Sequence, residues 1–216
     1  MTAPEGTAAG TYPVTVTTTG DGGLTASTDL NVTVGTGGGT TPPPATGNTP
    51  WINEINYDTS AANDAGEFVE VVVPAGVDVS GMSLVLYNGN GGASYRTDSF
   101  TSGIVSTTAS GTYTLYKFTY PSVNGGVLQN GSPDGIAICN DTTLVQFISY
   151  EGTFKATNGC ASGVTSTSIG SAAQDNTSAP DSSLQLVGTG NKYSDFTWTG
   201  PTTATPGAVN TGQTLN

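Results

Sequence analysis

The chain has 216 residues, no histidine and a net charge of −12, from 16 acidic and four basic side chains. A surface this acidic argues against direct nucleic-acid binding, because phosphate backbones are bound by clustered Lys and Arg, whereas the four basic residues here are scattered. Only 9% of the residues are charged and 31 are glycine, a composition that favours short strands joined by turns over surface helices.

Residues 1–34 carry the pattern of a β-hairpin. Apolar and polar residues alternate over 11–18 and 24–34, and the glycine-rich run 20–23 between them is typical of a turn. This segment resembles the last two strands of a bacterial immunoglobulin-like domain. Two strands cannot bury a core of their own. We therefore expect residues 11–34 to be disordered, to pack on the rest of the chain, or to pair with another chain in a strand-swapped homodimer.

Residues 35–50 are predicted to be a linker. Three consecutive glycines give flexibility, and the run of three prolines at 42–44 gives local extended stiffness. Composition changes sharply on either side, so residues 51–212 are expected to form one β domain. No stretch approaches 18 apolar residues, so no membrane span is expected. The first residues lack the features of a signal peptide, and we expect the chain to be a segment of a longer protein.

The domain at 51–212 shows short strand patterns at the spacing of a β-sandwich. Alternation over 67–71 predicts one face toward the core and one toward water, whereas the continuously apolar run 83–87 predicts a strand buried on both faces. Segment 162–180 is predicted to be a polar surface loop with at most one helical turn. The expected strands are 52–55, 67–71, 83–87, 94–100, 112–118, 135–139, 144–150, 183–187 and 196–199. The expected inner-face residues are Leu84, Leu86, Ile136, Ile138, Phe147, Leu184, Leu186 and Trp198.

A series of short motifs in this domain resembles a lamin tail domain. In chain order they are INEI (52–55), GEFVEV (66–71), GMSLVLY (81–87), DGIA (134–137), VQFISYEG (145–152), SLQL (183–186), DFTW (195–198) and TPGAVN (205–210). They cover nearly all of residues 51–212 and are most similar to lamin tail domains attached to secreted bacterial hydrolases, particularly extracellular nucleases. The resemblance implies an all-β, immunoglobulin-like β-sandwich with a non-catalytic accessory role.

The two cysteines, Cys139 and Cys160, are expected to form a disulfide. The Thr-rich, Gly-rich and Lys-poor composition is typical of a secreted or cell-surface protein, in which disulfides persist. A bridge closing about twenty residues would stabilise the fold by about 3 kcal/mol in the chain-entropy model. The alternative is two free buried thiols. The pair departs from the lamin-tail pattern, and without histidine it cannot complete a structural zinc site.

No catalytic set is expected in this chain. Serine or cysteine hydrolysis needs a base beside the nucleophile, and the sequence has neither histidine nor a Ser-x-x-Lys motif. Among the glutamates, Glu67 and Glu70 are three apart on one strand and are expected to face opposite sides. Glu54 and Glu70 would be neighbours if their strands pair, as a glycosidase would require. We instead expect solvated or loop-capping carboxylates there.

Two kinds of binding site remain open. Loop 58–67 offers oxygen ligands from Asp58, Asp64 and Glu67 for a structural calcium ion, although the spacing is not that of an EF-hand. The alternative for this loop is an Asx-rich surface turn. A glycan would need a platform of exposed aromatic rings, whereas tyrosines are common on sandwich surfaces without any ligand. The candidate rings belong to Tyr95, Tyr113, Tyr116, Tyr120 and Tyr193.

The sequence therefore predicts a non-catalytic module that spaces, presents or anchors the catalytic part of a larger secreted bacterial protein, such as a nuclease or another hydrolase. Its partners would be the adjacent domains of that protein. The alternative is a module that binds a glycan or cell-surface polymer and is stabilised by calcium. Clustered exposed tyrosines beside a groove would favour binding, whereas a flat Thr/Ser surface would favour a spacer.

Overall fold

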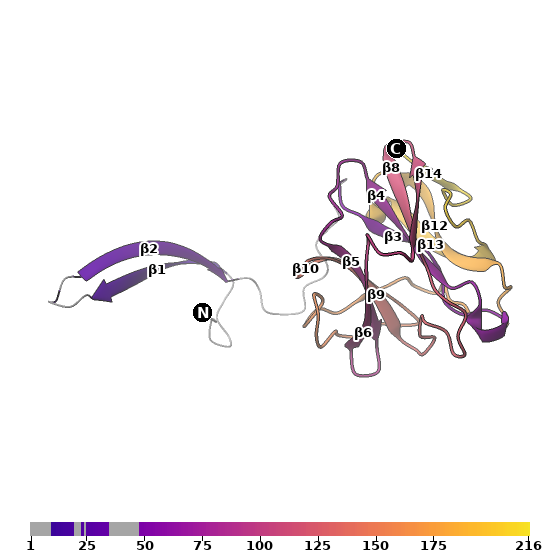
Figure 1. The fold of residues 1–216 in the computed structure, drawn as a ribbon, viewed down its shortest axis with the longest axis horizontal. Coiled ribbons are helices and arrows are strands. Elements are labelled where there is room, and N and C mark those ends of the chain that lie inside the picture. The colour runs from indigo at the N-terminus through magenta and orange to yellow at the C-terminus, as the bar shows by residue number, and fades with distance from the viewer. Residues whose placement is uncertain (1–9, 20–22, 24, 35–47) are drawn as a thin grey trace. The chain divides into compact units, whose positions relative to one another are not determined.

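The structure is a computed structural model that describes residues 10–19, 23, 25–34 and 48–216. Most of the predicted linker and of the turn at 20–23 lies outside the described residues. The chain divides into two compact units, 1–40 and 41–216, and this division falls within the predicted linker. The described residues are all-β, with only two short 3₁₀ turns (Figure 1). No helix among them is long and apolar enough to cross a membrane.

The first unit contains an antiparallel hairpin of β1 (Gly10–Thr19) and β2 (Thr25–Val34). Its register runs from Gly10 opposite Val34 to Thr19 opposite Thr25. Cross-strand hydrogen bonds join Thr15 to Asp29 at 2.7 Å and the Thr17 and Ser27 hydroxyls at 3.0 Å. The hairpin pattern in the sequence is thus realised, while its pairing with another chain stays a prediction.

The second unit consists of two sheets. The larger has the order β13-β12-β3-β4-β8-β7, with β14 paired in parallel to β12. Its strands are β13 (Phe196–Thr203), β12 (Ser182–Gly190), β3 (Trp51–Asn56), β4 (Phe68–Pro74), β8 (Tyr113–Thr119), β7 (Val105–Ser110) and β14 (Gln213–Leu215). The smaller sheet has the order β11-β10-β9-β5-β6. Its strands are β11 (Thr167–Ser168), β10 (Thr143–Tyr150), β9 (Asp134–Asn140), β5 (Met82–Asn88) and β6 (Ala93–Ser99).

The two sheets pack face to face around the main hydrophobic core, which makes this unit a β-sandwich (Figure 1). Alternate residues of the central strands supply the core, as the period of two in a strand requires. Val69 and Val71 enter it from β4, and Leu84 and Leu86 enter it from β5. The 3₁₀ turns are η1 (Ala62–Asp64) and η2 (Tyr193–Asp195). Segment 162–180 contains β11 and no helical turn.

The outer face of the five-stranded sheet is covered by the chain that follows β10, which we call the covering segment and which includes Phe154, Ala156 and Ala161. Val85 and Tyr87 of β5 pack there against Phe147 of β10 and against Phe154 and Ala161 of the covering segment. The predicted burial of strand 83–87 on both faces is therefore confirmed. Phe147 lies in this outer cluster and not in the core between the sheets, which corrects its predicted placement.

The outer face of the seven-stranded sheet is covered by residues 204–216, which we call the C-terminal strap. Trp51, Val72 and Phe196 form an apolar cluster on the sheet, and Leu215 of the strap packs against it. Leu186 also belongs to this cluster and not to the core between the sheets. Because the outer face of each sheet is covered, the prediction that one side of strand 67–71 faces water is wrong.

Candidate functional site

A row of polar side chains crosses the middle of the seven-stranded sheet beneath the C-terminal strap. Strand pairing places Gln185 of β12 opposite Glu54 of β3, Glu54 opposite Glu70 of β4, and Glu70 opposite Lys117 of β8. Glu54 and Glu70 are 0% exposed. The two carboxylates that the sequence suggested as possible neighbours are therefore directly paired, but both are buried, whereas a solvated strand face was one of the expectations.

Glu54 is held by donors from the strap and from β12. Its Oε1 accepts hydrogen bonds from the Thr205 backbone N–H at 2.7 Å and from the Ser183 hydroxyl at 2.6 Å. The Gln185 amide also donates to Oε1, and the Thr205 hydroxyl donates to Oε2. Burial raises the pKa of Glu54, and these hydrogen bonds oppose the rise because they favour the charged form.

Glu70 binds the strap two residues further on. Its Oε2 accepts a hydrogen bond from the Gly207 backbone N–H at 2.6 Å, and its Oε1 accepts a longer one from the Asn53 amide at 3.4 Å. Burial raises the pKa of Glu70 to about 7. The Gly207 hydrogen bond and the charge of Lys117 lower this pKa, while the charge of Glu54 raises it further.

Side-chain amides fasten the rest of the strap. The Asn210 amide donates to the backbone carbonyls of Asn53 at 3.1 Å and Leu186 at 2.9 Å. The Gln213 amide donates to the Asn53 side chain at 2.6 Å, and the Tyr113 hydroxyl donates to the carbonyl of Asn216. Of the two alternatives left open for Glu54 and Glu70, solvated or loop-capping carboxylates, the second describes both residues. Their oxygens bind the protein's own backbone.

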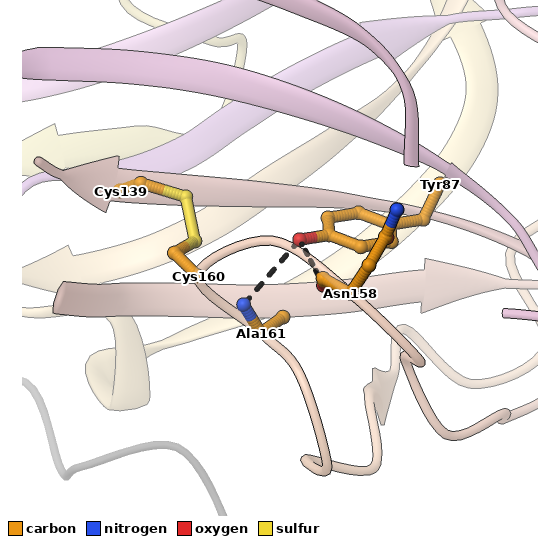
Figure 2. The surroundings of a disulfide bond; sticks show 5 residues. All are labelled: Tyr87, Cys139, Asn158, Cys160 and Ala161. Carbon is orange, nitrogen blue, oxygen red and sulfur yellow. Dashed lines mark hydrogen bonds between the residues drawn. A yellow bond between two sulfur atoms is a disulfide. The ribbon is translucent and has the colours of Figure 1, made fainter. Parts of the chain in front are cut away.

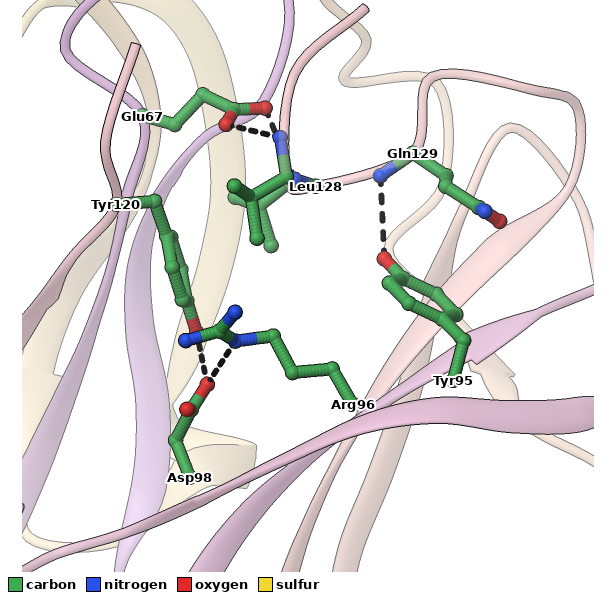
Figure 3. Close-up of polar contacts among 8 residues, drawn as sticks. Glu67, Tyr95, Arg96, Asp98, Tyr120, Leu128 and Gln129 are labelled. Atoms are coloured by element: carbon green, nitrogen blue, oxygen red, sulfur yellow. Dashed lines mark hydrogen bonds and ion pairs between the residues drawn. The ribbon is translucent and has the colours of Figure 1, made fainter. Parts of the chain in front are cut away.

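Glu67 holds a second segment in the same way. Its two oxygens accept the backbone N–H groups of Val127 at 2.5 Å and Leu128 at 3.0 Å, as Figure 3 shows for Leu128. Glu67 is only 1% exposed, and burial raises its pKa to about 7. In the next residue, the Gln129 N–H donates to the Tyr95 hydroxyl at 3.1 Å. The long β8–β9 connection is therefore pinned where it crosses between the sheets.

The predicted calcium ligands lie at one end of the sandwich. Asp58 and Asp64 are close enough to Glu67 that their charges raise its pKa, and Asp64 likewise raises the pKa of Asp58, for which burial is the larger cause. However, Glu67 turns its carboxylate to the backbone of 127–128. Within the described part of the chain, no group of three or more Asp, Glu, His or Cys side chains is arranged to hold a metal ion.

The five candidate tyrosines do not form a shared exposed platform. Tyr113 and Tyr120 are buried, and Tyr116 and Tyr193 are partly buried. Tyr95 is the only one of the five that is exposed, at 38%. The Tyr120 hydroxyl donates to Asp98, and its ring lies under the Arg96 guanidinium, 5.2 Å from the ring centroid (Figure 3).

Cys139 and Cys160 form the predicted disulfide, with their Cα atoms 6.1 Å apart. The ring of Tyr87 lies beside the bridge (Figure 2). Its hydroxyl donates to the carbonyl of Asn158 at 3.2 Å and accepts the N–H of Ala161 at 3.3 Å. The disulfide and this hydroxyl together hold the covering segment on the outer face of the five-stranded sheet.

Comparison of the chain with protein-family models, with curated proteins and with solved structures gives no match. Sequence reasoning missed three residues of this site. Ser183 and Gln185 donate hydrogen bonds to Glu54, and Asn210 fastens the strap to β12. The signal that could have identified Asn210 was the compact motif TPGAVN, which combines turn-forming residues with a short amide side chain.

Proposed function

We propose that this chain is a non-catalytic accessory module of a larger secreted bacterial protein, which spaces or anchors the catalytic part of a nuclease or another hydrolase. We further propose that residues 51–212 are an immunoglobulin-like sandwich of the lamin-tail type, as the ordered motifs suggest. The observation that carries the functional proposal is that the three buried glutamates are all engaged by backbone N–H groups of the chain itself.

A catalytic carboxylate has to reach its substrate. Glycoside cleavage needs two carboxyl groups on either side of an accessible bond. Glu54 and Glu70 instead lie under the strap and accept the N–H groups of Thr205 and Gly207 at 2.7 and 2.6 Å. A substrate could approach this pair only by displacing the strap, and displacement would leave two buried carboxylates without these donors, which is energetically costly.

The same contacts suit a rigid spacer. The strap is fixed to the seven-stranded sheet, and the segment after β10 is fixed to the five-stranded sheet by the disulfide. Disulfides persist mainly in oxidising compartments, which supports a secreted or cell-surface location. The tyrosines also favour a spacer over a glycan-binding module, because Tyr95 is the only exposed candidate ring and a platform needs several.

The proposal can be tested by incubating the full chain with nuclease, glycosidase, protease and esterase substrates, in the presence and absence of calcium and magnesium. We expect no turnover. The double variant Glu54→Gln/Glu70→Gln serves as the control, because it removes both carboxylates while keeping side chains of the same shape. Turnover by the natural chain that disappears in this variant would refute the proposal and assign the activity to this pair, whereas turnover that persists unchanged would originate elsewhere than in these two carboxylates.

A further inference from the structure

A pocket of about 310 Å³ opens at one end of the sandwich, between the β5–β6 turn and the end of the β8–β9 connection. We call it the amide pocket, because four side-chain amides line it. They belong to Asn88 and Asn90 at the turn and to Gln129 and Asn130 of the connection. The volume lies at the lower end of the range of roughly 300–1,000 Å³ that is typical of small-molecule sites. A pocket of this size suits a ligand built on a single six-membered ring.

The charges around the pocket favour a neutral ligand. Among the described residues that line it, none is a lysine or an arginine, and Asp134 is the only acidic one. The two oxygens of Asp134 already accept the N–H groups of Gly89 and Gly131, each at 2.9 Å. A cation would have to compete with these backbone donors. An anion would meet a carboxylate and no positive charge in the lining.

The side-chain amides match the hydroxyl groups of a sugar. An amide can donate and accept hydrogen bonds, as a hydroxyl can, so several amides can pair a row of hydroxyls. The Asn88 side-chain oxygen accepts the N–H of Asn90 at 2.7 Å, which leaves the NH₂ group of Asn88 to donate. The Asn90 side chain is itself exposed. The pocket can therefore hold a ligand with several hydroxyl groups without using any charge.

Gln129 supplies the group in the lining that most needs a partner. Within the described part of the chain, its Oε1 is buried and accepts no hydrogen bond. Buried polar atoms in proteins are nearly always paired, because an unpaired acceptor has lost its hydrogen bonds to water without compensation. A hydroxyl group of a ligand in the pocket would supply a donor for this oxygen.

An exposed aromatic ring stands beside the same residue. The Tyr95 hydroxyl accepts the Gln129 N–H at 3.1 Å, and Figure 3 shows the Tyr95 ring and the Gln129 side chain extending to the same side of this hydrogen bond. Tyr95 is partly open to a ligand, at 38% exposed. The C–H face of a sugar ring packs on such a surface and leaves the sugar hydroxyls free for hydrogen bonds. One sugar ring needs only one aromatic ring, unlike a platform for a glycan chain.

We propose that the amide pocket binds one neutral sugar ring of the pyranose form. The amides of Asn90 and Gln129 bind its hydroxyl groups, and its C–H face packs on the ring of Tyr95. The proposed role as an accessory module does not depend on this site. Failure to bind a sugar would leave that role intact, and substrate turnover would refute the role without affecting the pocket.

The test titrates the full chain with sugars and follows its amide groups by NMR. The probes are methyl β-D-glucopyranoside, methyl β-D-galactopyranoside and methyl α-D-mannopyranoside, which differ only in the orientation of their substituents. We expect at least one to bind with a Kd of about 1 mM, the affinity that roughly 13 non-hydrogen atoms provide at an ordinary ligand efficiency. The shifted signals should include the amides of Asn90, Gln129 and Asn130.

Two further probes test the hydroxyls and the charge. Cyclohexanol has a six-membered ring with a single hydroxyl, and D-glucuronate adds a negative charge to a sugar. Both should bind at least about tenfold more weakly than the best glycoside, because one lacks the partners of the amides and the other meets Asp134. The absence of binding by all three glycosides, or equal binding of cyclohexanol or D-glucuronate, would overturn the proposal.

Amide variants assign the hydrogen bonds. Asn90→Ala and Gln129→Met each remove one amide and should weaken the best glycoside about fivefold. Asn191→Ala removes an exposed amide outside the pocket lining. It is the matched control and should bind as the natural chain does. Thermal unfolding of each variant establishes that it is folded. Unchanged affinity in folded Asn90→Ala and Gln129→Met would refute the assignment.

Two variants of Tyr95 separate its ring from its hydroxyl. Tyr95→Leu removes the ring and should weaken the best glycoside about fivefold. Tyr95→Phe keeps the ring but loses the acceptor for the Gln129 N–H, and it should bind as the natural chain does. Equal weakening in both variants, or none in Tyr95→Leu, would refute the packing of the sugar on the ring.

Discussion

The buried glutamates should make the sandwich less stable at pH 8 than at pH 5. Burial raises the pKa of both Glu67 and Glu70 from an ordinary value of 4.5 to about 7. A carboxyl group whose pKa is higher in the folded state retains its proton more strongly there than in the unfolded chain. The stability that it contributes is complete below pH 4.5 and is lost as the pH rises through about 7.

The expected effect is large enough to measure. The interval between 4.5 and about 7 corresponds to about 3 kcal/mol for each carboxyl group, at 1.36 kcal/mol for each pKa unit. Domains of this size are commonly stable by only about 5–15 kcal/mol, so one such group is a substantial part of the total. The absence of histidine removes the side chain that ordinarily titrates between pH 5 and 8.

Urea unfolding at pH 5, 6, 7 and 8, followed by tryptophan fluorescence, measures this dependence. Trp51 and Trp198 both lie in the sandwich, so the signal reports on that unit. In Glu70→Gln the amide oxygen can still accept the N–H of Gly207, but the side chain cannot ionise. We therefore expect Glu70→Gln to reduce the stability difference between pH 5 and pH 8 by up to about 3 kcal/mol.

Asp141→Asn is the matched control. Asp141 is exposed and has a φ of 50°, a backbone conformation that asparagine tolerates well. This variant should show the pH dependence of the natural chain. The reasoning would be refuted if the natural chain were as stable at pH 8 as at pH 5, or if Glu70→Gln retained the full pH dependence.

Three further variants test how the covering segments are held. Replacing both Cys139 and Cys160 by serine should lower the free energy of unfolding by about 2–4 kcal/mol in urea titrations and speed proteolysis of the segment between them; unchanged proteolysis would contradict this. Gly159→Ala should destabilise by about 1–3 kcal/mol, because φ is +67° and a Cβ would lie 2.4 Å from the Tyr87 hydroxyl; an unchanged melting temperature would argue against this crowding. Asn210→Ala removes the donors to two backbone carbonyls and should lower the free energy of unfolding by about 1–3 kcal/mol. Amide hydrogen exchange should become faster in the strap and stay unchanged in the β1–β2 hairpin. Equally faster exchange in the strap and the hairpin would contradict a local loosening of the strap.

The strands of the sandwich were largely predictable because their apolar residues follow the period of a strand. Each of the nine expected strands overlaps an observed one, from β3 to β13. The strands that were missed lack that signal. β7 has the sequence VSTTAS, which contains too few apolar residues to show the alternation of a strand, and it lies at the edge of its sheet. β11 and β14 have two and three residues and are defined by parallel pairing with distant strands.

The environment of the glutamates was not predictable from local alternation. A polar residue between apolar ones normally marks a strand face in water, and for this reason a solvated strand face was one of the two alternatives for Glu70, beside a loop-capping role. Glu70 does point to the outer face, but the strap, which begins more than 130 residues later, covers it. The register that pairs it with Glu54 depends further on a bulge between Ile52 and Glu54. Neither feature leaves a trace in the local period.

The geometry of the strap explains why two neighbouring glutamates can both be satisfied by one short segment. The N–H of Thr205 binds Glu54 and the N–H of Gly207 binds Glu70. Between them stands Pro206, which has no N–H and so leaves no third donor to be buried without a partner. Gly207 has a φ of +83°, which glycine adopts without the strain that a side chain would cause. The backbone of Thr-Pro-Gly therefore presents two N–H donors, and no more, to two carboxylates on adjacent strands, and the Thr205 hydroxyl adds a side-chain donor to Glu54. A residue other than proline at 206 would add a donor that these two carboxylates do not accommodate.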